Sequence, residues 1–187
     1  MLVKHTRAAD RGFTLTELMV VVAITGVLAT LGFASLRSQV KAAWSAEAIS
    51  TVQSIRAAEE RWRTEYMMYA NVSTPGFWYP GSPISDPGEQ RPFFYAPGTG
   101  QHVNQEAWLA LRPTVSGPAR FGYLVNAGVA GEAMTTPTSP GPAIVWPTPP
   151  DNWYVIQAVG DTDGDGVFSY YRASSLNGEV FVFNPGE

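Results

Sequence analysis

The sequence predicts an α+β protein, in which one long N-terminal helix precedes an antiparallel sheet of about four strands. Three observations carry this prediction. Residues 18–36 contain no charge and no proline, and residues 37–69 continue with apolar side chains at helical spacing. All fifteen prolines and fifteen of the eighteen glycines lie after residue 74. Helix-forming and turn-forming sequence therefore occupy separate parts of the chain.

The first part of the predicted helix is long enough to cross a membrane. Its nineteen uncharged residues, 18–36, would span roughly 28 Å at about 1.5 Å per residue. Lys4, Arg7 and Arg11 precede this run, so we expect a cytoplasmic N-terminus and an exported remainder. A conventional secretory signal is the alternative, but it would require a shorter apolar run that ends at a small-residue cleavage site.

A specific motif opens the apolar run. It reads Gly12-Phe13-Thr14-Leu15-Thr16-Glu17-Leu18 and follows Arg11 directly. The segment resembles the class III signal of type IV prepilins and pseudopilins. The resemblance implies that a membrane-embedded prepilin peptidase cuts after Gly12 and that the new N-terminal residue, Phe13, is N-methylated.

The same resemblance divides the chain into four parts and implies a pilin-like fold. These parts are a leader (1–12), a membrane and filament-core half of the helix (13–36), an amphipathic half (37–69) and a β-rich head with Pro/Gly-rich loops (70–187). We expect the membrane half to project without an intramolecular partner, as the core of a helical filament requires.

The carboxylate of Glu17 calls for a partner on physical grounds alone. Placing a charge inside hydrocarbon costs roughly 2.5–3.5 kcal/mol on insertion scales. Cleavage before Phe13 would create an α-amine four residues away, in the same apolar surroundings. Glu17 is therefore expected to neutralise the amine of its own chain or of a neighbouring subunit, which would fix the axial register of assembly. The alternative is a glutamate that only marks the membrane interface.

Residues 37–69 predict an amphipathic helix packed on the sheet. An apolar stripe recurs at spacings of three, four and seven residues, formed by Trp44, Ala48, Val52, Ile55, Trp62, Tyr66 and Tyr69. The charged residues, Glu59 among them, are expected mostly on other faces. Arg56–Glu60 and Arg61–Glu65 have the spacing of surface ion pairs, each worth a few tenths of a kcal/mol.

The head begins with an aromatic, turn-rich stretch over 71–101, which we interpret as a long loop tucked onto the sheet by its aromatic side chains. A short helical turn is expected at 105–111. Four strands follow, predicted at 121–127, 153–160, 167–173 and 179–183, with Asn177-Gly178 as a hairpin signal between the last two.

The segment between the second and third predicted strands is a candidate metal site. It reads Asp161-Thr162-Asp163-Gly164-Asp165-Gly166, and its three carboxylates would converge if the chain turns at the glycines. Such hard oxygen ligands suit Ca²⁺. The twelfth position of an EF-hand loop would be Arg172, so the segment is not an EF-hand. A plain turn held by its own backbone hydrogen bonds is the alternative.

Composition excludes several functions. The net charge is −4, and removal of the leader takes away three basic residues and one acidic residue, leaving −6. An acidic head is poorly suited to nucleic acid. The chain has no cysteine, and His102 is the one histidine after the leader. We therefore expect no enzyme and no required cofactor, apart from the proposed Ca²⁺.

The primary expectation is a structural subunit of a type IV pilus, with a pseudopilin of a type II secretion system or a filament-tip adhesion module as alternatives. The resemblance implies as partners other pilins, prepilin peptidase, an inner-membrane assembly platform and, before assembly, the lipid bilayer. It places the protein first in the inner membrane with an exported head, and later in a surface pilus or a periplasmic pseudopilus.

Overall fold

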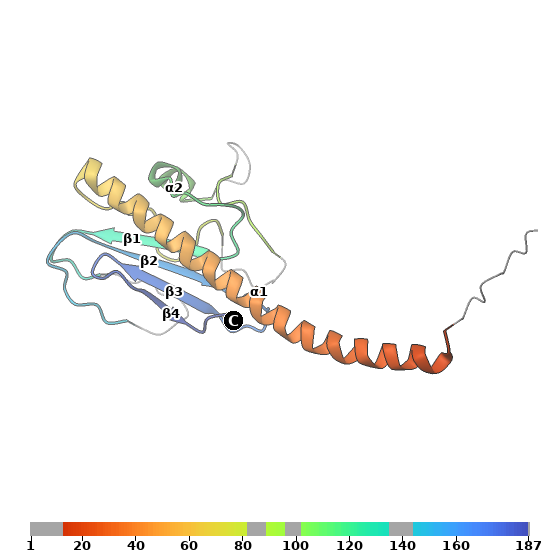
Figure 1. The fold of residues 1–187 in the computed structure, drawn as a ribbon. Coiled ribbons are helices and arrows are strands. Elements are labelled where there is room, and N and C mark those ends of the chain that lie inside the picture. The colour runs from red at the N-terminus through yellow and green to blue at the C-terminus, as the bar shows by residue number, and fades with distance from the viewer. Residues whose placement is uncertain (1–12, 82–88, 96–101, 135–143, 187) are drawn as a thin grey trace, which may run out of the picture. The chain divides into compact units, whose positions relative to one another are not determined.

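A computed structural model describes residues 13–81, 89–95, 102–134 and 144–186 of the chain (Figure 1). It confirms the predicted α+β architecture. The elements, in order, are α1 (Leu15–Tyr66), α2 (Gln105–Leu111), β1 (Gly122–Gly128), β2 (Trp153–Gly160), β3 (Ser169–Ser174) and β4 (Val180–Phe183). The chain divides into two compact units, Met1–Gln39 and Val40–Glu187, and α1 contributes residues to both.

The second unit is built on a meander sheet. Its four strands lie in the order β1-β2-β3-β4, and every neighbouring pair is antiparallel. The outer edge of β1 is occupied by the chain that follows α1, because Tyr79 and Tyr123 exchange backbone hydrogen bonds of 2.9 and 2.7 Å. Ser73 N–H donates to the carbonyl of Val125 in the same edge (3.1 Å). This edge is therefore closed within the chain.

The predicted apolar stripe of α1 covers one face of the sheet. Ala48, Val52 and Ile55 are fully buried, and Trp44 and Trp62 are partly buried against the same core. The sheet residues of this core alternate along the strands, as the period of two requires: Tyr123, Val125, Tyr154, Ile156, Ala158, Tyr171 and Ala173. The stripe prediction was wrong for Tyr66, whose side chain is 49% exposed.

The helix also ends three residues earlier than predicted. Met67 follows α1 with a φ of 58°, in the left-handed region, while its N–H still bonds to the carbonyl of Arg63 (2.9 Å). This residue turns the chain back, and the Tyr69 ring packs edge-on against Tyr154 at 4.7 Å. Tyr69 thus joins the core from the return segment, and not from the helix.

The remaining elements lie close to their predicted positions. α2 and β2 have the predicted bounds, and β1 is displaced by one residue. β3 begins at Ser169, two residues later than predicted, because the turn after β2 runs on through Gly166 and Val167. The loop that carries the Asn177-Gly178 signal joins β3 to β4, as expected.

Aromatic side chains fasten the long loop that follows α1. Trp78, Tyr79 and Phe93 are buried, and the Tyr79 ring stacks on Trp108 of α2 with centroids 4.9 Å apart. Phe77 is the exception, with 48% of its side chain exposed. The interpretation of these aromatics as structural anchors is confirmed for the described residues of the loop.

Neither predicted surface ion pair of α1 forms. The guanidinium of Arg56 instead donates to three backbone carbonyls, one at the last residue of β3, Ser174 (2.9 Å), and two in the loop that follows, Asn177 (2.6 Å) and Gly178 (2.8 Å). Arg61 similarly donates to the carbonyls of Leu111 and Arg112, where α2 ends. Carbonyls at the ends of elements have no ladder partner, and a guanidinium fork satisfies several of them at once. Arg56 thereby ties the C-terminal hairpin to α1 in a chain without disulfides.

We expect replacement of Arg56 by alanine to destabilise the head by about 2–3 kcal/mol, because three carbonyls lose a charged donor. Arg56→Lys should recover less than half of this loss, since an ammonium lacks the planar fork. The measurement is urea unfolding of a fragment comprising residues 37–187, which contains every buried core residue. Gln53→Ala, at an exposed position of α1, is the control. Equal unfolding midpoints for Arg56→Ala and this control would contradict the assignment.

Candidate functional site

The first turn of α1 is closed by reciprocal hydrogen bonds between Thr14 and Glu17. The Thr14 N–H and hydroxyl both donate to Glu17 Oε2, at 2.9 and 2.8 Å, and the Glu17 N–H donates to the Thr14 hydroxyl at 3.2 Å. This arrangement is a capping box, which satisfies backbone donors that have no partner inside the helix. Thr-x-x-Glu is its sequence signature, so Thr14 was readable from the sequence, although the partner expected for Glu17 was an amine.

Glu17 therefore already has a partner in the uncut chain. Its carboxylate is held at the N-terminal end of α1, in the turn that begins next to Phe13. Until the bond before Phe13 is cut, that residue has an amide and no free amine. Cleavage would place a cation beside a carboxylate that is fixed in position. The other residue of the predicted cleavage site, Gly12, lies outside the described residues.

The first unit presents an apolar helical surface that is exposed along its length. Phe13 is 86% exposed, and the large apolar side chains from Leu15 to Leu36 are 54–75% exposed. The apolar part of α1 reaches a mean hydropathy of 2.2 over eighteen residues and is, by length and composition, a candidate membrane span. Its hydroxyls are satisfied inside the helix: Thr25 donates to Val21 O (2.8 Å) and Thr30 donates to Val27 O (2.7 Å). Such internal pairing is what hydrocarbon requires.

The family comparison points to the same segment. Residues 7–33 match the prokaryotic N-terminal methylation motif, the class III signal of type IV pilins and pseudopilins. No curated protein and no solved structure matches the chain. The motif supports a type IV pilin-like or pseudopilin subunit that is processed by a prepilin peptidase, assembles with other pilins and is anchored in a membrane by its N-terminal helix.

The three carboxylates of the predicted metal site do converge. One oxygen from each of Asp161, Asp163 and Asp165 lies within 4.8 Å of the others. Asp161 is buried, and its two oxygens accept the N–H groups of Gly164 (2.7 Å) and Gly166 (2.9 Å). These bonds are the ones that the alternative reading, a plain turn, requires.

A built-in cation also reaches this acidic turn. Lys41 of α1 pairs with Asp163 at 3.0 Å, and its hydrogen bond holds the pKa of that carboxyl below the usual value. The ammonium offsets part of the repulsion among the three carboxylates. Mutual repulsion is therefore not by itself evidence for a bound metal ion.

The head contains a buried carboxyl that sequence reasoning placed on another face. Glu59 of α1 is fully buried; its Oε2 accepts the N–H of Ala70 at 2.8 Å, and its Oε1 has no hydrogen-bond partner. Burial raises the pKa of Glu59 to about 8, and the neighbouring charge of Glu60 acts in the same direction. The helical period alone could have placed this residue, because Glu59 is seven residues after Val52 and four after Ile55.

This carboxyl predicts an unusual pH dependence of stability. Glu59 binds its proton more tightly in the folded head than in the unfolded chain, where the pKa is near 4.5. Its contribution is therefore complete below about pH 4.5 and declines as the pH rises to about 8, by up to about 1.4 kcal/mol per unit. Unfolding of the 37–187 fragment at several pH values should show this decline, and Glu59→Gln should remove it. Glu65→Gln, at an exposed site, should retain it. An unchanged pH profile in Glu59→Gln would disprove the assignment.

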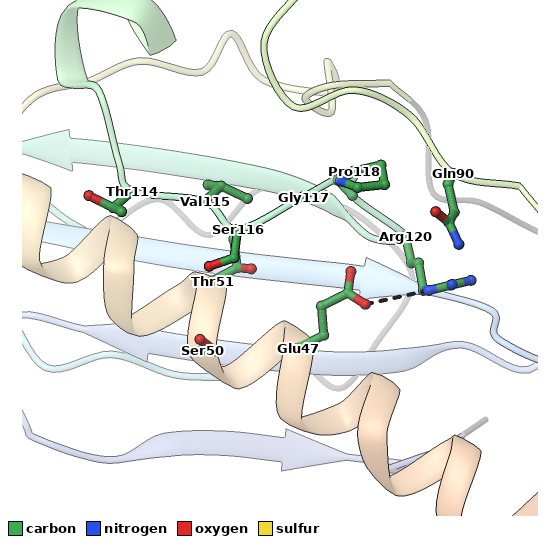
Figure 2. A pocket seen from close by; sticks show the side chains of 11 residues that line it. Glu47, Ser50, Thr51, Gln90, Thr114, Val115, Ser116, Gly117, Pro118 and Arg120 are labelled. Atoms are coloured by element: carbon green, nitrogen blue, oxygen red, sulfur yellow. Dashed lines mark ion pairs between the residues drawn. The ribbon is translucent and has the colours of Figure 1, made fainter.

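A polar cavity of about 340 Å³ lies between α1 and residues 114–120 (Figure 2). Glu47 and Arg120 form an ion pair across one end, with Nε and Oε2 3.4 Å apart, and the Arg120 guanidinium lies over the ring of Trp44. Burial raises the pKa of Glu47, while Arg120 opposes the shift. None of the residues predicted to carry function lines this cavity, and its eleven lining residues include no histidine.

Proposed function

We propose that this protein is a structural subunit, major or minor, of a type IV pilus. Its leader is removed after Gly12, Phe13 becomes the methylated N-terminus, and the helix from Phe13 to Leu36 forms the filament core. The observation that carries this proposal is the capped apolar helix, exposed along its length, which coincides with the matched methylation motif.

The proposal follows from how an apolar helix is stabilised. A helix that is apolar on all sides is stable only in hydrocarbon or among other such helices. A bilayer provides the first environment before assembly, and copies of the same helix provide the second. Copies that are related by rotation and translation, without closure, build an open helical filament. Glu17 then fixes the axial position of each copy by contacting the amine of a neighbour.

A pseudopilin of a type II secretion system would use the same processed helix in a short periplasmic filament. The two functions differ in where the mature protein accumulates. We expect processed protein in the filament fraction sheared from the surface of the source cells. Processed protein that is confined to the membrane fraction would overturn the pilus assignment in favour of a pseudopilin.

The acidic turn supports a second, subsidiary proposal: Asp161, Asp163 and Asp165 hold Ca²⁺. Their converging oxygens supply the ligand type that Ca²⁺ prefers. A bound ion would compete with Lys41 for Asp163. The Ca²⁺ would brace the turn between β2 and β3 in a head that has no cysteine.

Calcium should raise the melting temperature of the 37–187 fragment by several degrees relative to EGTA, since binding to the folded state alone adds stability. Lys41→Met should increase this response, because Asp163 becomes available to the ion. Asp163→Asn should reduce it, whereas Glu132→Gln, an exposed carboxylate outside the turn, should leave it unchanged. Equal melting temperatures in calcium and EGTA, for both the natural chain and Lys41→Met, would show that the segment is a plain turn.

A further inference from the structure

The last strand of the sheet exposes an uncharged apolar surface. Phe181 and Phe183, here called the β4 patch, are 42 and 48% exposed and share the sheet face of Tyr170, opposite the core under α1; Val182, 40% exposed, lies on the other face. No strand among the described residues pairs with the outer side of β4, whereas the opposite edge of the sheet is closed by residues 73–79. Exposed edge strands usually carry charges or proline that discourage contacts, and β4 has neither. The β4 patch therefore calls for a covering surface.

The C-terminal end of β4 lies close in space to the first residues of the second unit, which begins at Val40. Phe183 pairs with Tyr170 near the start of β3, and the next carbonyl, that of Asn184, accepts the Ser169 hydroxyl at 2.7 Å. Gly186 then packs against Lys41, close enough that a Cβ built on this glycine would lie 3.3 Å from the Lys41 Cβ. In Figure 1 the C-terminal end of β4 accordingly lies beside α1.

The short chain segment between the apolar run and Lys41 keeps this end of the head near the membrane. Lys41 is only five residues after Leu36, the last residue of the apolar run. Five residues span about 7.5 Å as a helix and at most about 18 Å when fully extended. Since the interfacial region on each side of the hydrocarbon is several ångströms thick, Lys41 lies at or near it in an anchored subunit.

The charges around the β4 patch indicate which lipid surface fits. Asp163 and Asp165 are exposed in the turn that precedes β3, at the same end of the sheet, and Lys41 offsets one of these charges. Two further charges nearby, those of Asp161 and of Arg172 opposite Phe181, are buried and of opposite sign. A net negative end is repelled by anionic headgroups but not by zwitterionic ones. Aromatic side chains are well suited to the interface between headgroups and acyl chains.

We propose that the β4 patch docks on a zwitterionic phospholipid surface while the subunit is anchored and not yet assembled. The head would thereby be held against the bilayer through the aromatic side chains of Phe181 and Phe183. This inference rests on the proposed membrane span.

The test uses the full chain, reconstituted at low protein-to-lipid ratio in phosphatidylcholine vesicles that contain spin-labelled lipid. Because the chain has no cysteine, a single introduced cysteine can carry an environment-sensitive fluorophore. Pro185→Cys places the fluorophore beside the β4 patch and leaves the patch residues unchanged. Val129→Cys, which follows the far end of β1, is the matched control. We expect lipid quenching at 185 to exceed that at 129 by at least about threefold, as for a group 5–10 Å deep in the interface.

Adding Phe181→Ser and Phe183→Ser to the Pro185→Cys chain should reduce its quenching to the level of the control. Equal quenching at the two positions, or quenching at 185 that persists in the serine variant, would overturn the proposal. Shielding of the fluorophore at 185 from water that appears only at high protein-to-lipid ratio would show that a second copy, and not lipid, covers the patch.

Co-flotation with the vesicles is measured separately. A chain that does not float lacks the membrane span, which refutes both this inference and the proposed function. A chain that floats with equal quenching refutes only the docking.

Discussion

Replacing Gly12 by valine should abolish removal of the leader. In the proposed processing the cut bond lies between Gly12 and Phe13, inside the matched residues 7–33, and a β-branched side chain there adds bulk directly beside the scissile carbonyl. We expect only the longer precursor on gels, no methylated Phe13, and no sheared filaments. The chain should still insert in the membrane, since its apolar run is unchanged.

The matched control is Ala9→Val, which adds comparable bulk inside the leader but three residues from the cut bond. It should be processed normally. Cleavage of the Gly12→Val chain at the natural rate would contradict the assigned processing site. Loss of processing in both variants would indicate general misfolding of the leader.

Replacing Glu17 by alanine should leave cleavage intact but reduce filament yield by at least about tenfold. The variant removes the proposed partner of the new Phe13 amine, and an unpaired charge in apolar surroundings costs several kcal/mol. It also removes the capping contact with Thr14, worth about 1 kcal/mol. The measurements are the ratio of mature protein to precursor and the amount of mature protein in the sheared fraction.

Thr14→Ala separates these two contributions, because it removes the capping box and keeps the carboxylate. Its filament yield should fall much less than that of Glu17→Ala. Normal filaments in Glu17→Ala would show that the carboxylate only marks the membrane interface. Equal losses in the two variants would assign the whole effect to helix capping.

Much of the fold could be predicted because its signals are local. The charge-free run, the helical spacing of Val52 and Ile55, and the alternating strands each report on a few adjacent residues. The bounds of α2 and β2 were predicted correctly for this reason. The Asp/Gly turn and the Asn177-Gly178 signal likewise depend on local backbone chemistry.

Other features could not be predicted because they depend on contacts distant in sequence. Arg56 was assigned to Glu60, four residues away, but it binds carbonyls more than a hundred residues later in the chain. The helix end at Tyr66 depends on a left-handed methionine, which no propensity favours. The charge of Glu59 predicts a solvent-facing side chain, but this side chain is buried and accepts a hydrogen bond from the N–H of Ala70, eleven residues later.

Recognition of the N-terminal motif is confirmed by the match over residues 7–33, while the roles of its individual residues stay predictions. Gly12, Phe13 and Glu17 form a linear motif, which is recognised by order and spacing and needs no tertiary structure. The structure adds the capping partner Thr14 and the exposed apolar surface of α1. For the acidic turn, spacing predicted the convergence of its carboxylates, but the neighbouring ammonium of Lys41 comes from a residue 122 positions away.

The central claim is that the mature protein begins at Phe13 and assembles through the helix that follows. The most direct test is the mass of the N-terminal peptide of the protein isolated from its source cells. The account predicts a peptide that begins with N-methylated Phe13 and carries no leader. A protein that retains residues 1–12 in every cell fraction would contradict the account and leave a simple membrane-anchored domain.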